Sequence, residues 1–488
     1  MNEIEPIKVR RPIGDEAPTA TLFYGASCLE TLRGLPTGSI HCAVTSPPYW
    51  GLRDYDGEPQ VWGGDPNCDH EWGEVGRAHH PNQVEQTKWK DAEAAGKGQT
   101  AGSGQFCGRC DAWLGQFGLE PTPQMFVQHL VEIFRELRRV LRDDGTFWLN
   151  LGDSYAGSGP SGASYQSETT KRREGQTREG NFSISKRLGE RGLSYKDKKP
   201  VPPPGLKSKD LVGVPWRAAF ALQEDGWYLR SDIIWAKGNP MPESVRDRPT
   251  RAHEYMFLFA KKARYFYDHE AIKERDSGRA SMNKERQTNH QPDGQGAFGT
   301  HVPWESDGSG RNKRTVWNVN PRPYKGAHFA VFPTELIEPC ILAGTSEKGC
   351  CPMCGTPWER HVERHAVEPD AVVSDGRKDL HGPTYSRHKQ RVPGGQSLVS
   401  TKKVGESWHP GCGCPDHEPI PCTVLDPFSG SGTTGVVALD NGRAYVGLDI
   451  NESYADLAVA RLLGEDAPSR VDDDGGGGIL ELFGVQGG

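Results

Sequence analysis

Two short segments far apart in the chain carry residue types suited to group-transfer chemistry. The first, Thr45 to Tyr49, reads Thr-Ser-Pro-Pro-Tyr. Its prolines fix the backbone and leave carbonyl groups without competing local donors, so these carbonyls and a serine hydroxyl can accept hydrogen bonds from an amine. Tyr49, or Trp50 beside it, adds an aromatic face for a flat ring. The residues expected to handle the amine and its ring are Ser46, Pro47, Pro48 and Tyr49.

The second segment, Asp426 to Gly435, is rich in glycine and lies in a strand-turn-helix pattern. An apolar run over 423–425 ends at Asp426, and 436–439 read as the body of a helix. A further apolar run ends in Asp449, so one βαβ unit carries an acid at the tip of each strand. Such a unit suits an adenosyl ligand, because glycines admit it closely and the second carboxylate can accept hydrogen bonds from ribose hydroxyls.

Two alternatives for this segment stay open. A phosphate-binding loop needs a lysine after its last glycine, and Thr433 and Val436 occupy those places, which argues against a nucleoside triphosphate. A glycine-rich turn without any ligand is the other alternative.

These segments resemble the motifs of the amino-methylating DNA methyltransferases. The run 426–435 is similar to their S-adenosylmethionine-binding motif, and 46–49 to their catalytic tetrapeptide in the Ser-Pro-Pro-Tyr form. The catalytic motif comes first and the cofactor motif last, an order similar to that of the circularly permuted beta group. Further similar segments are 139–146, 148–154, 234–237, 253–255 and 328–344. The resemblance implies an α/β fold, namely a Rossmann-like S-adenosylmethionine-dependent methyltransferase sheet with helices on both faces.

The resemblance also implies roles for individual residues. Since a sulfonium is already a strong electrophile, the tetrapeptide mainly has to orient the amine for in-line displacement, while an extruded base stacks on Tyr49 or Trp50. Asp153 and His253 are further candidates, although each could equally cap a strand or a helix. Pro-Pro-Tyr can also form a plain extended loop. Cofactor contacts are expected from Asp426, Phe428, Ser429, Gly430, Gly432, Thr433, Asp449 and Thr334, with Glu338 nearby.

The predicted acceptor is cytosine N4 in double-stranded DNA, because the Ser form of the tetrapeptide most resembles enzymes of that specificity. Adenine N6 is the alternative. Carbon methylation would need a cysteine nucleophile, but Cys340 falls inside a predicted buried helix and Cys422 directly precedes the cofactor strand. A catalytically inactive zinc-containing DNA-binding protein, or an enzyme acting on RNA or protein, is also compatible with these motifs.

Cysteine spacing predicts two structural zinc sites that staple insertions onto this fold. The chain has 12 cysteines and is not expected to be secreted, so metal sites are favoured over disulfides. Four protein ligands leave no open position, so each zinc should be separable from catalysis. Unliganded thiols in loops are the alternative. The predicted ligand sets are Cys68, His70, Cys107 and Cys110, and Cys351, Cys354, Cys412 and Cys414, with His417 or Cys350 as substitutes in the second.

Length and composition agree with this class. The 488 residues suffice for a full α/β core with extra modules. Residues 1–11 are polar and no apolar run has membrane-spanning length, so a cytoplasmic location in a prokaryotic or phage-infected cell is expected. A net charge of −7 argues against a nucleic-acid partner, but basic residues are dense over 171–209 and 246–314. A cognate restriction nuclease is a further candidate partner.

The expected organisation follows the motifs. Apolar residues at helical spacing predict a helix over 123–141. In the tail, Leu480–Phe483 resembles peptides that dock on the replication sliding clamp, although it could also fold back onto the enzyme. The expected regions are the first strands and catalytic loop (20–56), a zinc-binding insertion (57–120), the methyltransferase core (121–272) with a mobile loop (156–208), a target-recognition region (273–326), a helix (327–344), a second zinc module (345–422), the cofactor-binding βαβ unit (423–464) and a flexible tail (465–488).

Overall fold

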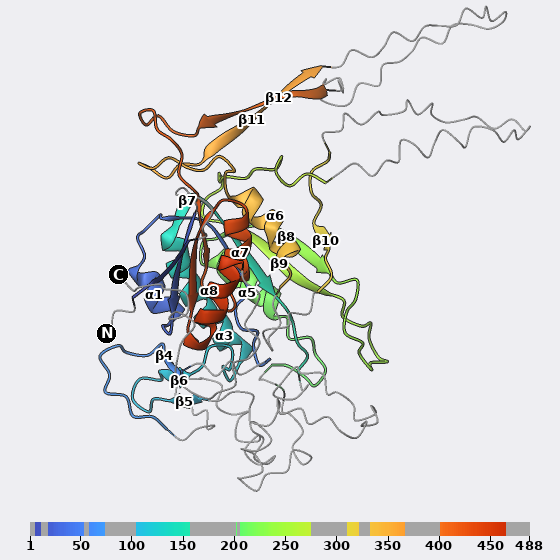
Figure 1. Cartoon of the computed structure of the whole chain (residues 1–488). Coiled ribbons are helices and arrows are strands. Elements are labelled where there is room, and N and C mark those ends of the chain that lie inside the picture. The colour runs from blue at the N-terminus through green and yellow to red at the C-terminus, as the bar shows by residue number, and fades with distance from the viewer. Residues whose placement is uncertain are drawn as a thin grey trace, which may run out of the picture. The chain divides into compact units, whose positions relative to one another are not determined.

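The computed structural model forms two compact units (Figure 1). Unit 1 comprises Met1–Tyr267, Thr315–Glu347 and Pro421–Gly488, and unit 2 comprises Asp268–Arg314 and Lys348–Ile420. The structure describes residues 5–10, 18–52, 58–73, 104–156, 202, 205–274, 310–321, 332–366 and 401–464. These ranges leave out most of the predicted mobile loop and most of the predicted target-recognition region. They also leave out the tail, including Leu480–Phe483, which resembles peptides that dock on the sliding clamp. Among the described residues, no helix is both long and apolar enough to cross a membrane.

Within its described residues, unit 1 is built on a nine-stranded mixed sheet. The five strands from β2 to β7 in the order below run parallel, and β9 is antiparallel to both neighbours. β3 and β13 pair although they come from opposite ends of the chain, so the carboxyl ends of both motif strands lie side by side. The strand order is β1 (Ile7–Arg10), β2 (Thr19–Tyr24), β14 (Ala444–Asp449), β13 (Thr423–Asp426), β3 (Ile40–Thr45), β7 (Leu141–Leu151), β9 (His253–Ala260), β8 (Tyr228–Ala236) and β10 (Val316–Asn318).

Helices cover both faces of this sheet. α1 (Cys28–Gly34), α3 (Pro123–Val140) and α5 (Val214–Glu224) pack as one group, and α6 (Thr334–Gly344), α7 (Thr433–Asp440) and α8 (Ala455–Leu463) as another. Successive side chains of a strand point to opposite faces. In β3, Ala43 lies in the core cluster with α1 and α3, whereas the Cys42 thiol contacts the Cys340 carbonyl of α6 at 3.8 Å. The predicted α/β sheet with helices on both faces is therefore confirmed.

The predicted helix over 123–141 is α3. Thr122 caps its first turn, because the Met125 N–H donates to the Thr122 hydroxyl at 3.2 Å, and a proline stands at the first helical position. The apolar residues at helical spacing face inward as expected. The fully buried members are Phe126, Leu130, Ile133, Phe134 and Leu137.

A small second sheet lies within the predicted zinc-binding insertion. Its order is β4 (Gln60–Trp62), β6 (Trp113–Gly115) and β5 (Gly104–Phe106), with antiparallel pairing throughout. It packs on α3, because Trp62 stacks on the ring of His129 at 4.7 Å and Trp113 lies 5.6 Å from the same ring. The Nδ1 atom of His129 lies 3.1 Å from a carboxylate oxygen of Glu120, and both side chains are buried.

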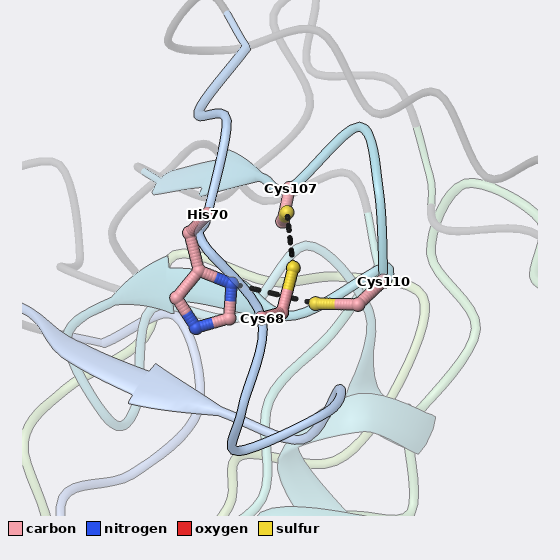
Figure 2. A group of neighbouring side chains, drawn as sticks. All are labelled: Cys68, His70, Cys107 and Cys110. Atoms are coloured by element: carbon pink, nitrogen blue, oxygen red, sulfur yellow. Dashed lines mark hydrogen bonds between the residues drawn. The ribbon is translucent and has the colours of Figure 1, made fainter.

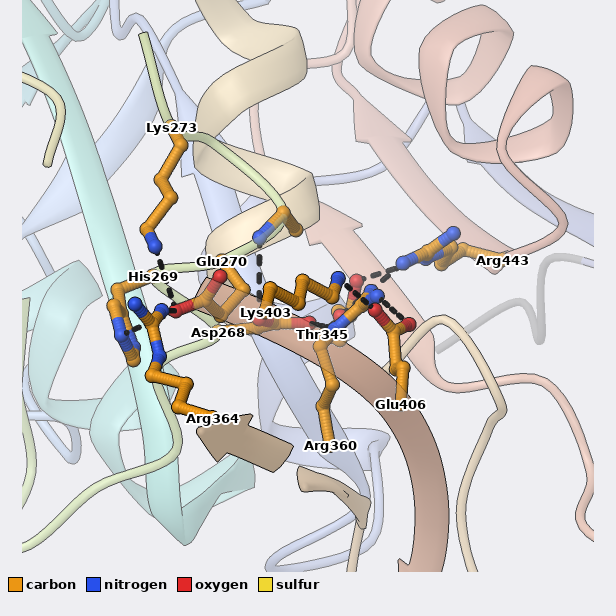
Figure 3. A network of polar contacts seen from close by, with 11 residues as sticks. Asp268, His269, Glu270, Lys273, Thr345, Arg360, Arg364, Lys403, Glu406 and Arg443 are labelled. Carbon is orange, nitrogen blue, oxygen red and sulfur yellow. Dashed lines mark hydrogen bonds and ion pairs between the residues drawn. The ribbon is translucent and has the colours of Figure 1, made fainter. Parts of the chain in front are cut away.

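Unit 2 combines parts of three predicted regions, because it begins at Asp268, near the end of the predicted methyltransferase core. The hairpin of β11 (Trp358–Ala366) and β12 (Thr401–Pro410) is joined by ion pairs to the segment 268–274 (Figure 3). Arg360 contacts the buried carboxylate of Asp268 at 2.9 Å, and Arg364 contacts Glu270 at 2.6 Å. Residues 273–314 of the predicted target-recognition region and most of the second zinc module thus fall in one compact unit.

Candidate active site

A buried carboxylate joins the two motifs at the ends of β3 and β13. Asp426, the last residue of β13, accepts hydrogen bonds from the hydroxyls of Thr45 at 2.5 Å and Thr434 at 2.7 Å. A third bond comes from the backbone N–H of Phe428 at 3.0 Å. Burial raises the pKa of Asp426 to about 6, against the opposing effect of the three donors. Asp426 therefore holds the strand before the tetrapeptide against the glycine-rich loop and α7.

The side chains of the glycine-rich loop face the protein. The hydroxyl of Ser429 lies 2.9 Å from that of Tyr24, which also donates to the Gly430 carbonyl at 2.8 Å. The hydroxyl of Thr433 accepts a hydrogen bond from Arg461 at 2.9 Å. Ser429 and Thr433, both predicted as cofactor contacts, thus use their hydroxyls to shape the loop. A bound ligand would meet the backbone of this loop.

Asp449 stands at the tip of β14 beside the same loop. One of its carboxylate oxygens accepts a hydrogen bond from the Gly430 N–H at 2.7 Å, and the other from the Asn451 N–H at 2.9 Å. Gly430 makes this approach with a φ of +49°, which favours glycine. Burial raises the pKa of Asp449 to about 6. Because each carboxylate oxygen has a further lone pair, this fixed group suits a ligand with hydroxyl donors such as ribose.

Of the remaining predicted cofactor residues, Thr334 and Glu338 belong to α6 and Phe428 belongs to the loop. Thr334 is the first residue of α6, which packs against α7, and its hydroxyl donates to Glu335 at 3.2 Å. Glu338 of the same helix is exposed. The Phe428 ring stacks on Phe117 at 5.6 Å with an interplanar angle of 14°.

The tetrapeptide is surrounded by polar groups that the sequence did not single out. The Tyr49 hydroxyl lies 3.0 Å from an Asn150 oxygen and 2.8 Å from a Glu254 oxygen, and Glu254 also pairs with Lys237. The Tyr49 ring lies so close to Gly152 that a Cβ there would be 2.5 Å from it. These residues fall in segments quoted above for the resemblance, where polar residues interrupt largely apolar strands. Polar residues within largely apolar strands were therefore the sequence signal that could have identified these partners of Tyr49.

Trp50 does not offer a stacking surface. Its side chain is buried, and the indole N–H donates to the Glu120 carbonyl at 2.9 Å, so the expectation of a base stacked on Trp50 is wrong. Asp153 accepts hydrogen bonds from the N–H groups of Gly213 and Val214 and therefore caps α5. His253 packs edge-on against the neighbouring Tyr255.

The two cysteines weighed against carbon methylation are both buried. Cys340 lies inside α6, and Cys422 directly precedes β13. The helix and loop positions predicted for them are confirmed, and neither is presented as a nucleophile.

Each predicted zinc ligand set is gathered in space within its own unit. In unit 1, the Sγ atoms of Cys68 and Cys107 lie 3.9 Å apart, and the Cys110 Sγ lies 3.4 Å from the His70 Nδ1 (Figure 2). In unit 2, Cys351, Cys354, Cys412 and Cys414 form the second group, and within each group all ligand atoms lie within 4.8 Å of one another. Each group offers four donors of the types that zinc prefers.

Comparison with known proteins agrees with this geometry. A family model described as DNA methylase matches residues 40–351 and 422–460. Type II methyltransferase M.Cfr9I of Citrobacter freundii is 35% identical over 469 residues, which cover 94% of this chain and 93% of that relative. Type II methyltransferase M.SmaI of Serratia marcescens is 35% identical over 434 residues, covering 89% of this chain and 88% of the relative. With the family model matching well over half of its length and such relatives spanning nearly all of it, the chain belongs to the DNA methylase family.

Proposed function

We propose that this protein transfers a methyl group from S-adenosylmethionine to the N4 amine of cytosine in duplex DNA. The observation that carries the proposal is the position of Asp426, which binds Thr45 directly before the tetrapeptide and Thr434 directly after the glycine-rich loop. An amine held by the first motif and a ligand held by the second would therefore meet at the same end of two adjacent strands.

The cofactor half fits an adenosyl ligand. Side chains of the loop bind the protein behind it, which leaves the backbone of 428–432 for contact with a ligand. Two N–H groups fix the carboxylate of Asp449, and each of its oxygens keeps a lone pair that can accept a hydrogen bond from a ligand. Phe428 adds an aromatic ring beside the loop. When bound, S-adenosylmethionine supplies an electrophilic methyl group on a sulfonium.

The tetrapeptide half fits an extruded base. The Ser46 hydroxyl and the carbonyls of the adjoining prolines accept the amine hydrogens and so direct the nitrogen lone pair. Asn150 and Glu254 contact the hydroxyl of Tyr49 and thereby hold the far end of its ring in place. Lys237 balances the charge of Glu254 in this half-buried position. Orientation of the amine, rather than covalent catalysis, is the contribution of these residues.

Cytosine N4 is proposed over adenine N6 because a serine, Ser46, occupies the first position of the tetrapeptide. We further propose that unit 2 takes part in target recognition, since it holds residues 273–314 of the predicted recognition region together with the β11–β12 hairpin. The relatives M.Cfr9I and M.SmaI are named Type II methyltransferases. A partner restriction nuclease stays a prediction.

Sequencing that reads modified bases directly tests the proposal. DNA from methylase-free cells that express the chain should carry N4-methylcytosine at one short sequence, and DNA from cells expressing Ser46→Ala should carry little or none. Modification of adenine would overturn the choice of base. Unmodified DNA from cells that contain folded wild-type protein would overturn the proposed function.

A further inference from the structure

We propose that the first metal site holds zinc and that this zinc positions the active site. The site consists of Cys68, His70, Cys107 and Cys110. The sequence alone favoured a zinc that merely staples an insertion, but the contacts made by this insertion lead to both catalytic motifs. The inference rests on the proposed function, because it concerns the geometry of the same methyl-transfer site.

The four donor atoms lie within 4.8 Å of one another, as a closed site with four protein ligands requires (Figure 2). With zinc-sulfur bonds of about 2.3 Å, two thiolates in a tetrahedron lie roughly 3.8 Å apart, and the observed separation of Cys68 and Cys107 is 3.9 Å. The backbone is shaped around these sulfurs, since a Cβ at Gly64 would lie 2.8 Å from the Cys110 Sγ. The Gly108 N–H donates to the Glu71 carbonyl at 2.9 Å, which ties the two halves of the site together.

A direct chain path connects this site to β6. Cys110 is followed by Asp111, which has a φ of +60°, and by the fully buried Ala112, which directly precedes β6. The Cys107 N–H donates to the Ala112 carbonyl at 2.8 Å, so the cysteine knuckle and the residue that leads into β6 form one hydrogen-bonded turn. Within β6, Trp113 packs on His129 of α3. The position of the metal ligands therefore sets the position of β6.

The residues after β6 hold the catalytic tetrapeptide. The carbonyl of Gly118 accepts a hydrogen bond from the Gly51 N–H at 2.8 Å, and the carbonyl of Glu120 accepts one from the Trp50 indole at 2.9 Å. Gly118 also packs so closely on Pro48 that a Cβ there would lie 2.9 Å from the proline ring. We call residues 117–120 the clamp segment.

The clamp segment also reaches the cofactor half. Phe117 stacks on Phe428 of the glycine-rich loop, with ring centroids 5.6 Å apart. A shift of the clamp segment would therefore move both Pro48 and Phe428. Effective molarity depends steeply on the geometry of the reacting groups, so a displacement on the order of 1 Å can cost roughly 100-fold in rate.

The small sheet needs the metal to hold this segment in place. Each of β4, β5 and β6 has only 3 residues, fewer than the roughly 5–6 of a typical strand, so only short ladders of backbone hydrogen bonds hold this sheet together. The ligand pairs 68–70 and 107–110 are also far apart in sequence, so closing the chain between them carries an entropic cost that metal binding offsets.

Paired ligand variants of the full chain test the proposal. Cys110→Ser should lose about one zinc per chain by elemental analysis and should lower kcat at least tenfold. Cys354→Ser, in the ligand set of unit 2, should also lose about one zinc and serves as the matched control for loss of a metal. Hydrogen exchange at 46–52 and 117–120 should become faster in Cys110→Ser and stay unchanged in Cys354→Ser.

A variant that leaves every metal ligand intact tests the role of the clamp segment independently of zinc binding. Gly118→Ala should retain its zinc and still lose kcat, because its Cβ would press on Pro48 at a residue whose φ is +95°. A Cys110→Ser protein that has lost the zinc of this site but keeps wild-type kcat and wild-type exchange would overturn the proposal, as would wild-type protein that binds no zinc at this site. If the wild type methylates no DNA, the proposed function fails, while the exchange comparison still decides whether the metal orders 46–52.

Discussion

Thr45→Val tests the junction between the two motifs. The substitution keeps the shape of a fully buried side chain but removes the hydroxyl that donates to Asp426 at 2.5 Å. Asp426 would keep two donors, the Thr434 hydroxyl and the Phe428 N–H. We expect lower stability together with slower methyl transfer, because the strand end that carries the tetrapeptide is no longer fixed to the cofactor half.

The expected magnitude follows from the charge on Asp426. A hydrogen bond to a charged group contributes about 1.5–3 kcal/mol, so the free energy of unfolding at pH near 7.5 should fall by roughly 2 kcal/mol. Below the raised pKa of about 6 the carboxyl is protonated, and the cost should fall toward the roughly 1 kcal/mol of a neutral bond. Denaturant unfolding at about pH 7.5 and about pH 5 measures both values.

Two comparisons make the result specific. Thr146 is also fully buried, but its hydroxyl contacts Cys42 and the Trp148 indole rather than a carboxylate, so Thr146→Val should show little pH dependence. Thr45→Val and Thr434→Val should be non-additive, because both remove donors from one carboxylate. If Thr45→Val costs less than about 0.5 kcal/mol at both pH values and leaves kcat unchanged, Asp426 does not join the motifs as argued.

Four further results are expected. Burial raises the pKa of Asp449 to about 6. Calorimetry should therefore show that cofactor affinity falls as the pH drops below about 6, by up to roughly tenfold per pH unit. Asp449→Asn should bind the cofactor more weakly, and its affinity should not depend on pH in this range. The same raised pKa means that the folded protein holds this proton more tightly, so the contribution of Asp449 to the free energy of unfolding should decrease as the pH rises from about 4 to about 6. Tyr49→Phe loses the hydroxyl contacts with Asn150 and Glu254. Its cofactor affinity should be unchanged, while the rate in single-turnover assays should fall at least about fivefold, which corresponds to about 1 kcal/mol of transition-state binding. An equal loss of cofactor affinity would place Tyr49 in the cofactor pocket. Cys351→Ser should release about one zinc per chain and speed proteolysis of unit 2 with cofactor affinity intact, and a zinc-free wild type would contradict both predicted sites.

Local pattern was enough to predict the cofactor half of the fold. The apolar runs before Asp426 and Asp449 and the glycines between them specify strand, turn, helix and strand, which the structure shows as β13, α7 and β14. Helical spacing likewise predicted α3 to within one residue. These features depend on neighbours a few positions apart, which is the range over which periodicity and turn chemistry act.

Contacts between distant segments could not be predicted in the same way. The partners of Asp426 depend on β3 lying beside β13, a pairing between opposite ends of the chain. Trp50 follows the tetrapeptide and looks like a stacking residue in sequence, but the Glu120 carbonyl that binds its indole comes from a segment 70 positions later. Asp268 and Arg360, which join the two segments of unit 2, are 92 positions apart. Each of these contacts depends on the tertiary fold, which brings together residues that are far apart in sequence.

The central claim is that the joined motifs methylate the N4 amine of cytosine, and labelled methyl transfer tests it most directly. Purified protein is incubated with duplex DNA and S-adenosylmethionine that carries an isotopically heavy methyl group, and the nucleosides are then separated by mass spectrometry. We expect the heavy methyl in N4-methyldeoxycytidine, and its absence when the Ser46→Ala protein is used. Heavy methyl in N6-methyldeoxyadenosine or 5-methyldeoxycytidine, or none in any nucleoside, would contradict the account.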